Sequence, residues 1–141
     1  MLPLSFIREN KDLVLKGLKK RNFSDLEIID QILELDHNRR SVQTKLENNF
    51  SVSNKINKEI GLIVKSGKKE NLSSLKNESS NLKNDSKKLQ EELREIEDKL
   101  LLIRVKIPNI PNEIVLQGNS SEDNEEIFKY GEMPSLKSKS P

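Results

Sequence analysis

The feature that most constrains the fold is a ladder of regularly spaced residues in a long segment that has no proline before Pro108. The steps alternate between four and three residues through two runs, 28–63 and 72–103, and most rungs are apolar. Apolar residues at a mean period of about 3.5 specify a left-handed coiled coil, so the ladder predicts two long helices that pack along one seam. The rungs are Ile28, Ile32, Leu35, Arg39, Val42, Leu46, Asn49, Ser53, Ile56, Ile60 and Ile63, then Leu72, Leu75, Ser79, Leu82, Ser86, Leu89, Leu93, Ile96, Leu100 and Ile103.

A short break separates the two runs. The sequence KSGKKEN, residues 65–71, contains Gly67, which suits the left-handed backbone at a helix end. Because the linker is short, the helices must fold back on each other as an antiparallel hairpin, with Ile63 facing Leu72. At about 1.5 Å per residue, helices of roughly forty residues make an arm on the order of 60 Å long.

The middle of the predicted seam is polar. The pairing places Asn49 opposite Ser86, with Ser53 and Ser79 close by. Buried polar groups cost stability unless they find partners. The simplest interpretation is therefore local softness, or a means of fixing the register of the two helices.

The sequence as a whole predicts an all-α protein: a short N-terminal helical module, a long antiparallel two-helix coiled-coil hairpin and an extended C-terminal connector. Asn10 is a reasonable N-cap in the module, and Ser24 with Glu27 matches a capping box. Pro108 and Pro111 end the second long helix, because proline lacks an N–H and disfavours helical backbone before it. The expected bounds are root helices in 1–23, the first long helix in 24–65, a tip turn in 66–71, the second long helix in 72–107, and a linker in 108–141, with 1–107 forming one arm.

Composition narrows the class of protein. Charged residues make up 34% of the chain and aromatic residues 4%, with no tryptophan, which favours an elongated molecule. The absence of cysteine excludes a disulfide and a thiolate metal site. His37 has no partners at catalytic or metal-ligand spacing, so we expect it to be an exposed helix residue. We also expect no catalytic residue and no metal site in this chain. No apolar stretch is long enough for a signal peptide or a membrane span, and we expect a cytoplasmic protein.

Charge is unevenly distributed along the chain. Residues 51–90, the distal half of the hairpin, contain nine lysines and four acidic residues, a net charge of +5, whereas the whole chain carries +2. A basic far end suits the binding of a polyanion at a distance from the body of a protein. The alternative is that the lysines only solvate an exposed coiled coil.

Heptad geometry gathers part of this charge on one flank. In an antiparallel pair, positions b and e of both helices share a flank, and apart from Glu47 and Glu97 nearby this flank is basic or amide-bearing. Lysine and arginine neutralise phosphates, while amides bond to sugar and phosphate oxygens. The flank carries Arg40, Gln43, Glu47, Phe50, Asn54, Asn57 and Gly61 from the first helix, and Lys76, Lys83, Lys87, Gln90 and Arg94 from the second.

The chain contains, in this order, MLPLSFIREN, ILELDHNRRSVQTKLE, NKINKEIG, IPNIPNEIVLQG and EEIFKYGEMP. Together these five motifs resemble the N-terminal domain of seryl-tRNA synthetase. MLPLSFIREN resembles the family's MLDxKxIREN start, and ILELDHNRRSVQTKLE is similar to LLxLDxxRRxLQxExE. NKINKEIG, IPNIPNEIVLQG and EEIFKYGEMP resemble NxxSKEIG, IPNIPHPSVPxG and xEvrxWGexP. The resemblance extends from Met1 to about Pro134, and IPNIP is its most specific element.

The resemblance implies a class II aminoacyl-tRNA synthetase, a homodimer that attaches serine to its tRNA with ATP and magnesium. It implies that the hairpin grips the long variable arm and elbow of serine tRNA, and of selenocysteine tRNA if present. The chain contains no class II catalytic motif, so we expect no cofactor and no catalysis from these residues alone. We expect 108–141 to lead towards a catalytic domain that is absent from this chain, and the chain by itself to be a monomer.

The chain departs from the family pattern at several positions. Lys11 stands where proline is common, Asn112 where histidine is frequent, and Tyr130 where tryptophan is usual. Ser53 stands where the family has an arginine, so this chain lacks a basic group at that position.

The sequence therefore leads to one hypothesis and one rival. The first is a tRNA-binding arm, and the rival is a free-standing coiled-coil module that docks protein partners. A steep salt dependence of binding would favour the first, because phosphate contacts release counterions. The residues predicted to contact tRNA are Arg40, Gln43, Asn54, Lys76, Lys83, Lys87 and Arg94, with Lys68 and Lys69 as weaker candidates.

Overall fold

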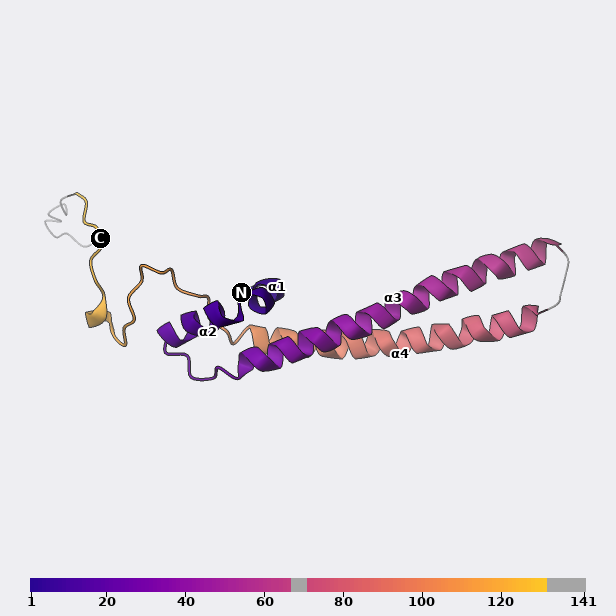
Figure 1. Cartoon of the computed structure of the whole chain (residues 1–141), viewed down its shortest axis with the longest axis horizontal. Coiled ribbons are helices and arrows are strands. Elements are labelled where there is room, and N and C mark those ends of the chain that lie inside the picture. The colour runs from indigo at the N-terminus through magenta and orange to yellow at the C-terminus, as the bar shows by residue number, and fades with distance from the viewer. Residues whose placement is uncertain (67–70, 132–141) are drawn as a thin grey trace, which may run out of the picture.

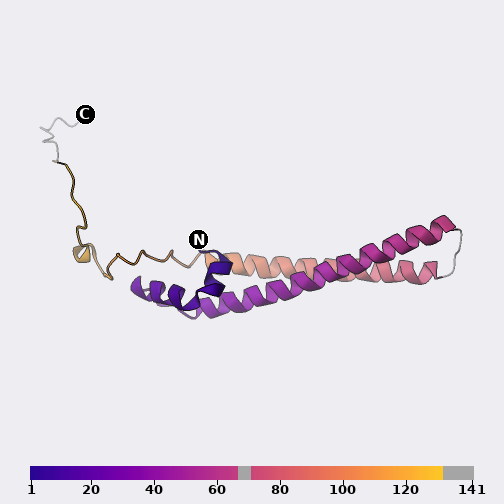
Figure 2. The same cartoon turned by 45° about the horizontal axis from the view of Figure 1, so that its top comes forward.

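Two long antiparallel helices form an arm that dominates the molecule (Figure 1). Helix α3 spans Ile28–Ser66 and helix α4 spans Leu72–Arg104. The computed structural model describes residues 1–66 and 71–131, and those residues form helices, turns and extended segments but no strand. Figure 2 shows that α3 and α4 cross each other along the arm. The predicted all-α hairpin is confirmed, while most of the predicted tip turn, with Gly67, lies outside the described residues.

Side-chain burial along the arm follows the predicted ladder. In residues 37–66 and 72–103, every rung is buried or half-buried, and every other side chain, His37 included, is exposed. A helix that packs against a single partner buries only a narrow stripe of its surface from solvent. The buried surface of each helix is therefore limited to its rungs. Within the described residues, no helix has an apolar stretch of the length that a bilayer crossing requires.

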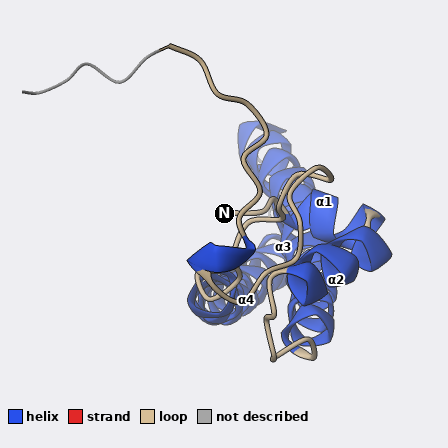
Figure 3. Cartoon of the chain, turned by 90° about the vertical axis from the view of Figure 1, so that its left-hand side faces the viewer, coloured by secondary structure: helices blue, strands red, loops and turns tan. Residues whose placement is uncertain are grey.

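The hydrophobic core lies at the root of the arm, where two short helices join α3 and α4. Helix α1 spans Leu4–Glu9 and α2 spans Lys11–Lys20. Figure 3 looks at this end of the molecule and shows α1 and α2 on the α3 side of the hairpin. The buried core residues are Ile7, Val14, Leu18, Ile28, Ile29, Ile32, Val42, Ile96, Leu100 and Ile107. The root thus has several layers, whereas the arm has a single seam.

The first long helix begins at Ile28, four residues after the predicted start. The expected capping box at Ser24 does not initiate it, because residues 24–27 form the turn between α2 and α3. In this turn the Leu26 N–H donates to the Ser24 carbonyl oxygen at 3.1 Å, and the Leu26 side chain packs against the core. Packing of Leu26 against the core therefore determines where α3 starts, and the capping box predicted at Ser24 does not.

The second long helix ends at Arg104, three residues before the predicted end. The next residues form looser bonds, such as Ile107 N–H to the Arg104 carbonyl oxygen at 3.2 Å. Proline at 108 disfavours helical backbone at the preceding residue. Ile107 instead turns its side chain into the core, where it is 6% exposed.

The connector after Ile107 continues away from the arm and runs alongside the C-terminal half of α2 (Figure 1). Ile110 sits directly over Gly17, where an added Cβ would overlap its side chain. Lys20 Nζ donates to the Glu113 carbonyl oxygen at 2.9 Å, and Arg21 Nη1 to that of Asn109 at 3.0 Å. The first part of the predicted linker is therefore attached to the root.

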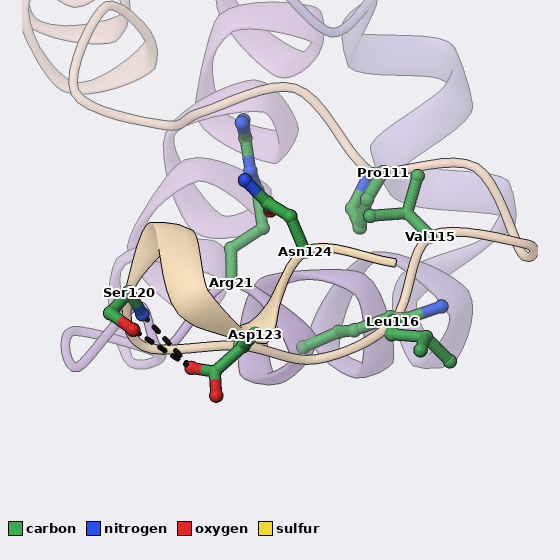
Figure 4. Close-up of a pocket in the computed structure, with 9 residues that line it drawn as sticks. Arg21, Pro111, Val115, Leu116, Ser120, Asp123 and Asn124 are labelled. Atoms are coloured by element: carbon green, nitrogen blue, oxygen red, sulfur yellow. Dashed lines mark hydrogen bonds between the residues drawn. The ribbon is translucent and has the colours of Figure 1, made fainter. Parts of the chain in front are cut away.

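A small turn follows where the connector passes the C-terminal end of α2 (Figure 4). It contains the short 3₁₀ helix η1, Ser121–Asp123. The Asp123 carboxylate accepts hydrogen bonds from the Asn119 N–H at 2.7 Å and the Ser120 N–H at 3.0 Å. These backbone donors lower the pKa of Asp123. The carboxylate closes the turn. We therefore assign a structural role to the pocket drawn in Figure 4, which Asp123 and Arg21 help to line.

Candidate nucleic-acid interface

A shallow depression opens along one flank of the arm, near the middle of α3 and α4. Its volume is about 550 Å³. It lies on the flank that heptad positions b and e predicted, and we call it the basic depression. Its lining residues are Phe50, Ser53 and Asn57 from α3, and Ser79, Lys83, Ser86, Lys87 and Gln90 from α4.

Small polar rungs create this depression. Ser53, Ser79 and Ser86 occupy seam positions that isoleucine or leucine fills near the ends of the arm. Ser86 is 6% exposed and so forms the floor. Ser79 Oγ donates to Asn57 Oδ1 at 3.0 Å and thereby links the two helices. The polar middle of the seam therefore leaves room and presents hydroxyl groups in it.

The charges that line the basic depression are all positive. Lys83 and Lys87 stand one turn apart on α4, and no carboxylate lines the hollow. Residues four apart are neighbours on a helix surface, so the two ammonium groups serve the same small area. Positive charge with hydroxyl and amide groups suits phosphates and sugars.

The opposite flank carries a second depression with a different balance of charge. This mixed depression has a volume of about 420 Å³. It presents equal numbers of ammonium and carboxylate groups, on Lys45, Lys99, Glu92 and Glu95. Its charges can neutralise each other, so an anion gains little there. The arm therefore has one flank suited to a polyanion.

The structure brings together some of the predicted contact residues. Lys83 and Lys87 share the basic depression. Asn54, Lys76 and Arg94 are exposed at the same heptad positions but do not line it. The weaker candidates at 68 and 69 lie outside the described residues.

Sequence reasoning did not select several residues that line the depression. The sequence placed Phe50, Asn57 and Gln90 on the flank but not among the predicted RNA contacts. Ser86 was interpreted only as part of the polar middle of the seam. The heptad position of Phe50, Asn57 and Gln90, which Lys83 shares, was the signal that could have identified those three residues.

Two predicted contact residues, Arg40 and Gln43, also take part in a network of ion pairs and hydrogen bonds near the root. Arg40 Nε lies 3.3 Å from Asp36 Oδ2. Gln43 accepts from Arg39 Nη1 at 3.1 Å and donates to Glu47 Oε1 at 3.0 Å. These partners fix both side chains and leave them fewer donors for a ligand.

The centre of the network is Asp36, a carboxylate only 1% exposed. Arg8 Nη1 of α1 donates to Asp36 Oδ2 at 2.9 Å, and Arg39 Nη2 donates to Asp36 Oδ1 at 3.0 Å. Burial by itself would raise the pKa of Asp36, but the bonds from Arg39 and Arg8 and the charges of Arg39 and Arg40 outweigh it and lower the pKa. The network joins the first helix of the root to the base of the arm.

Part of this network was readable from the sequence. Arginines three and four residues after an aspartate lie on the same helix face, so Asp36 could have been paired with Arg39 and Arg40. Arg39, one of the rungs, is half-buried, and its guanidinium donates to Asp36. The contribution of Arg8 depends on the tertiary fold.

Comparisons with known proteins agree with this architecture. The family model described as "Seryl-tRNA synthetase N-terminal domain" matches residues 1–111. Serine–tRNA ligase from Thermotoga neapolitana is 42% identical over 132 residues, which cover 94% of this chain and 31% of the relative. The ligase from Caldicellulosiruptor saccharolyticus is 50% identical over 132 residues, 94% of this chain and 30% of the relative. The chain thus spans about a third of the length of the curated relatives it matches.

Solved structures show the same fold. The crystal structure of seryl-tRNA synthetase from Pyrococcus horikoshii complexed with ATP is similar with a TM-score of 0.77 and 31% identity, over 88% of this chain and 28% of that one. The cytoplasmic serine–tRNA ligase from Naegleria fowleri in complex with AMP gives a TM-score of 0.70 over 94% of this chain and 35% of that one. Its 23% identity supports the fold alone. By its family model and its relatives, this chain belongs to the seryl-tRNA synthetase N-terminal domain family.

Proposed function

We propose that this chain is the tRNA-binding arm of a serine–tRNA ligase and that its basic flank is the RNA-binding face. The observation that carries the proposal is the basic depression, where Lys83 and Lys87 stand among hydroxyl and amide groups without a carboxylate. Membership of the family supplies the class of ligand, and the depression supplies the face.

The geometry of the arm suits the recognition of RNA by shape. A helix of 39 residues is about 60 Å long, so the basic depression is held well away from the root. Double-stranded RNA is recognised mainly through its backbone and 2′-hydroxyls, and the groups on this flank suit such contacts. We propose the long variable arm and elbow of serine tRNA as the target, with selenocysteine tRNA as a second target if present.

Within this proposal we rank the predicted contact residues by where they lie on the arm. Lys83 and Lys87 come first because both line the basic depression. Asn54, Lys76 and Arg94 extend the face towards the tip and the root. Arg40 and Gln43 contribute less, because the root network already binds them, and residues 68 and 69 remain weaker predictions.

The whole protein would add functions that these residues do not carry. In the proposal, a catalytic domain binds ATP and magnesium and attaches serine, and the full-length protein is a cytoplasmic homodimer. Residues 108–141 would lead towards that domain. The chain by itself would be a monomer without catalytic activity.

Binding measured at two salt concentrations tests the proposal. We expect this chain to prefer a serine tRNA with its long variable arm over a tRNA with a short one, and to bind more weakly at the higher salt. Lys83→Ala with Lys87→Ala should lower the slope of log affinity against log salt by about 0.7–0.9 for each phosphate that is no longer neutralised. Equal affinity for both tRNAs would contradict the proposal. A weak salt slope with a protein partner would favour the rival interpretation, a protein-docking coiled coil.

A further inference from the structure

Phe50 is the one phenylalanine, tyrosine or tryptophan of α3 and α4, and it lines the basic depression. Its side chain is 44% exposed. A single exposed apolar residue is ordinary on a protein surface. The location of this ring is informative, because it lines the same depression as two lysines and three serines.

We infer that the basic depression binds one unpaired nucleotide of the RNA, with its base stacked on the Phe50 ring. This inference rests on the proposed function and specifies how one part of the RNA is held. The bases of a duplex are stacked and paired, so only a loop, bulge or end can offer a free base face. Aromatic side chains are the usual platform for such bases, whatever their identity.

Each part of a nucleotide has a matching group in the depression. The base faces Phe50, and the phosphates on either side meet Lys83 and Lys87, which neutralise them. The volume of about 550 Å³ falls within the roughly 300–1,000 Å³ that small-molecule sites span.

The ribose and the base edges find polar partners on the floor and wall. Ser79 Oγ donates to Asn57 Oδ1, so the hydroxyl oxygen can still accept a bond. The Asn57 amide nitrogen can donate, since it makes no hydrogen bond within the part of the chain that the structure describes. Gln90 offers a further amide at the root end of the hollow. A ribose 2′-hydroxyl both donates and accepts, so these groups favour RNA over DNA.

The mixed depression provides an internal comparison. It contains aliphatic, polar and charged residues but no aromatic ring, and its two glutamates would repel phosphates. Aromatic surface and unopposed positive charge therefore occur together on one flank.

The test uses the full chain and transcripts of a serine tRNA in which one unpaired residue at a time is 2-aminopurine. In the wild type we expect the fluorescence of one position to be quenched on binding, as stacking on the ring requires. Phe50→Leu should weaken binding about 5- to 100-fold, the loss expected for one base–aromatic stack, without changing the salt slope. Phe50→Tyr should bind within about twofold of the wild type, because it keeps the ring.

Val52→Ala is the matched control, since Val52 is a 41% exposed residue of α3 that does not line the depression. We expect it to leave the affinity unchanged. If Phe50→Leu binds as tightly as the wild type, while Lys83→Ala with Lys87→Ala binds weakly, the stacking is refuted and the proposed function survives. If the wild type shows no salt-dependent RNA binding, both fail.

Discussion

The root and the arm share the same two long helices but bury them to different degrees. At the root, α1, α2 and the connector cover the helices, and residues such as Ile29 and Ile32 are fully buried. Along the arm each helix has only the other, and most rungs are half-buried. The difference indicates a division of roles, in which the root supplies stability and the arm supplies an extended surface for binding.

Removing core volume at the root should have the largest effect on stability. Ile32→Ala removes a side chain that is 0% exposed, and we expect the free energy of unfolding to fall by about 2–5 kcal/mol. Ile63→Ala, at a half-buried rung near the tip, should cost only about 1 kcal/mol. Urea denaturation of both variants measures the difference. Equal losses would show that stability is not concentrated at the root.

The buried carboxylate of the root network should have the next largest effect. Asp36→Asn keeps the shape but removes the charge that Arg8, Arg39 and Arg40 share. We expect a loss of about 2 kcal/mol in the free energy of unfolding at pH 7. Arg94→Gln, a change at an exposed position of the arm, is the control and should cost less than about 0.5 kcal/mol.

The same carboxylate predicts a pH dependence. Its folded pKa is lowered from the ordinary value of 3.8, so the unfolded chain takes up the proton first as the pH falls. Its contribution is therefore complete well above pH 3.8 and is lost as the pH falls through the lower folded pKa. Denaturation between pH 7 and pH 2 should show a smaller acid loss in Asp36→Asn than in the wild type. An identical acid loss would rule out this role.

Filling the basic depression should separate stability from binding. Ser86→Leu places an apolar side chain at a seam position, and we expect a gain of about 1 kcal/mol in the free energy of unfolding. The same change should weaken RNA binding by about tenfold, because the filled hollow excludes the ligand. Ser41→Leu, in the mixed depression, should leave RNA affinity within about twofold. A variant that is more stable and binds as before would contradict the location of the site.

The smallest effect on stability should come from the lysines themselves. Lys83→Ala with Lys87→Ala should change the free energy of unfolding by less than about 0.5 kcal/mol, because both side chains are exposed and lie in the arm. Thermal or urea denaturation checks this. A larger loss would mean that the lysines also stabilise the fold. A weaker RNA affinity of the variant could then no longer be assigned to lost phosphate contacts alone.

The hairpin and its flanks could be predicted because they follow from periodicity. The ladder of rungs fixes which residues are buried and therefore which flank shows Lys83 and Lys87. The bonds between Arg8 and Asp36, and the packing of Ile110 on Gly17, join residues far apart in sequence and have no periodic signature. The start of α3 was misplaced because Ser24 has the local chemistry of a cap, while burial of Leu26 decides the turn.

The most direct test of the central claim compares the two flanks with the same change of charge. Lys83→Glu with Lys87→Glu reverses the basic depression, and Lys45→Glu with Lys99→Glu changes the mixed depression by the same amount. Because both variants alter the net charge equally, long-range attraction falls equally. In serine tRNA binding at fixed salt, we predict that the first variant loses at least about tenfold more affinity than the second, because it can no longer neutralise the bound phosphates. Equal losses in the two variants would contradict an RNA-binding face on the basic flank.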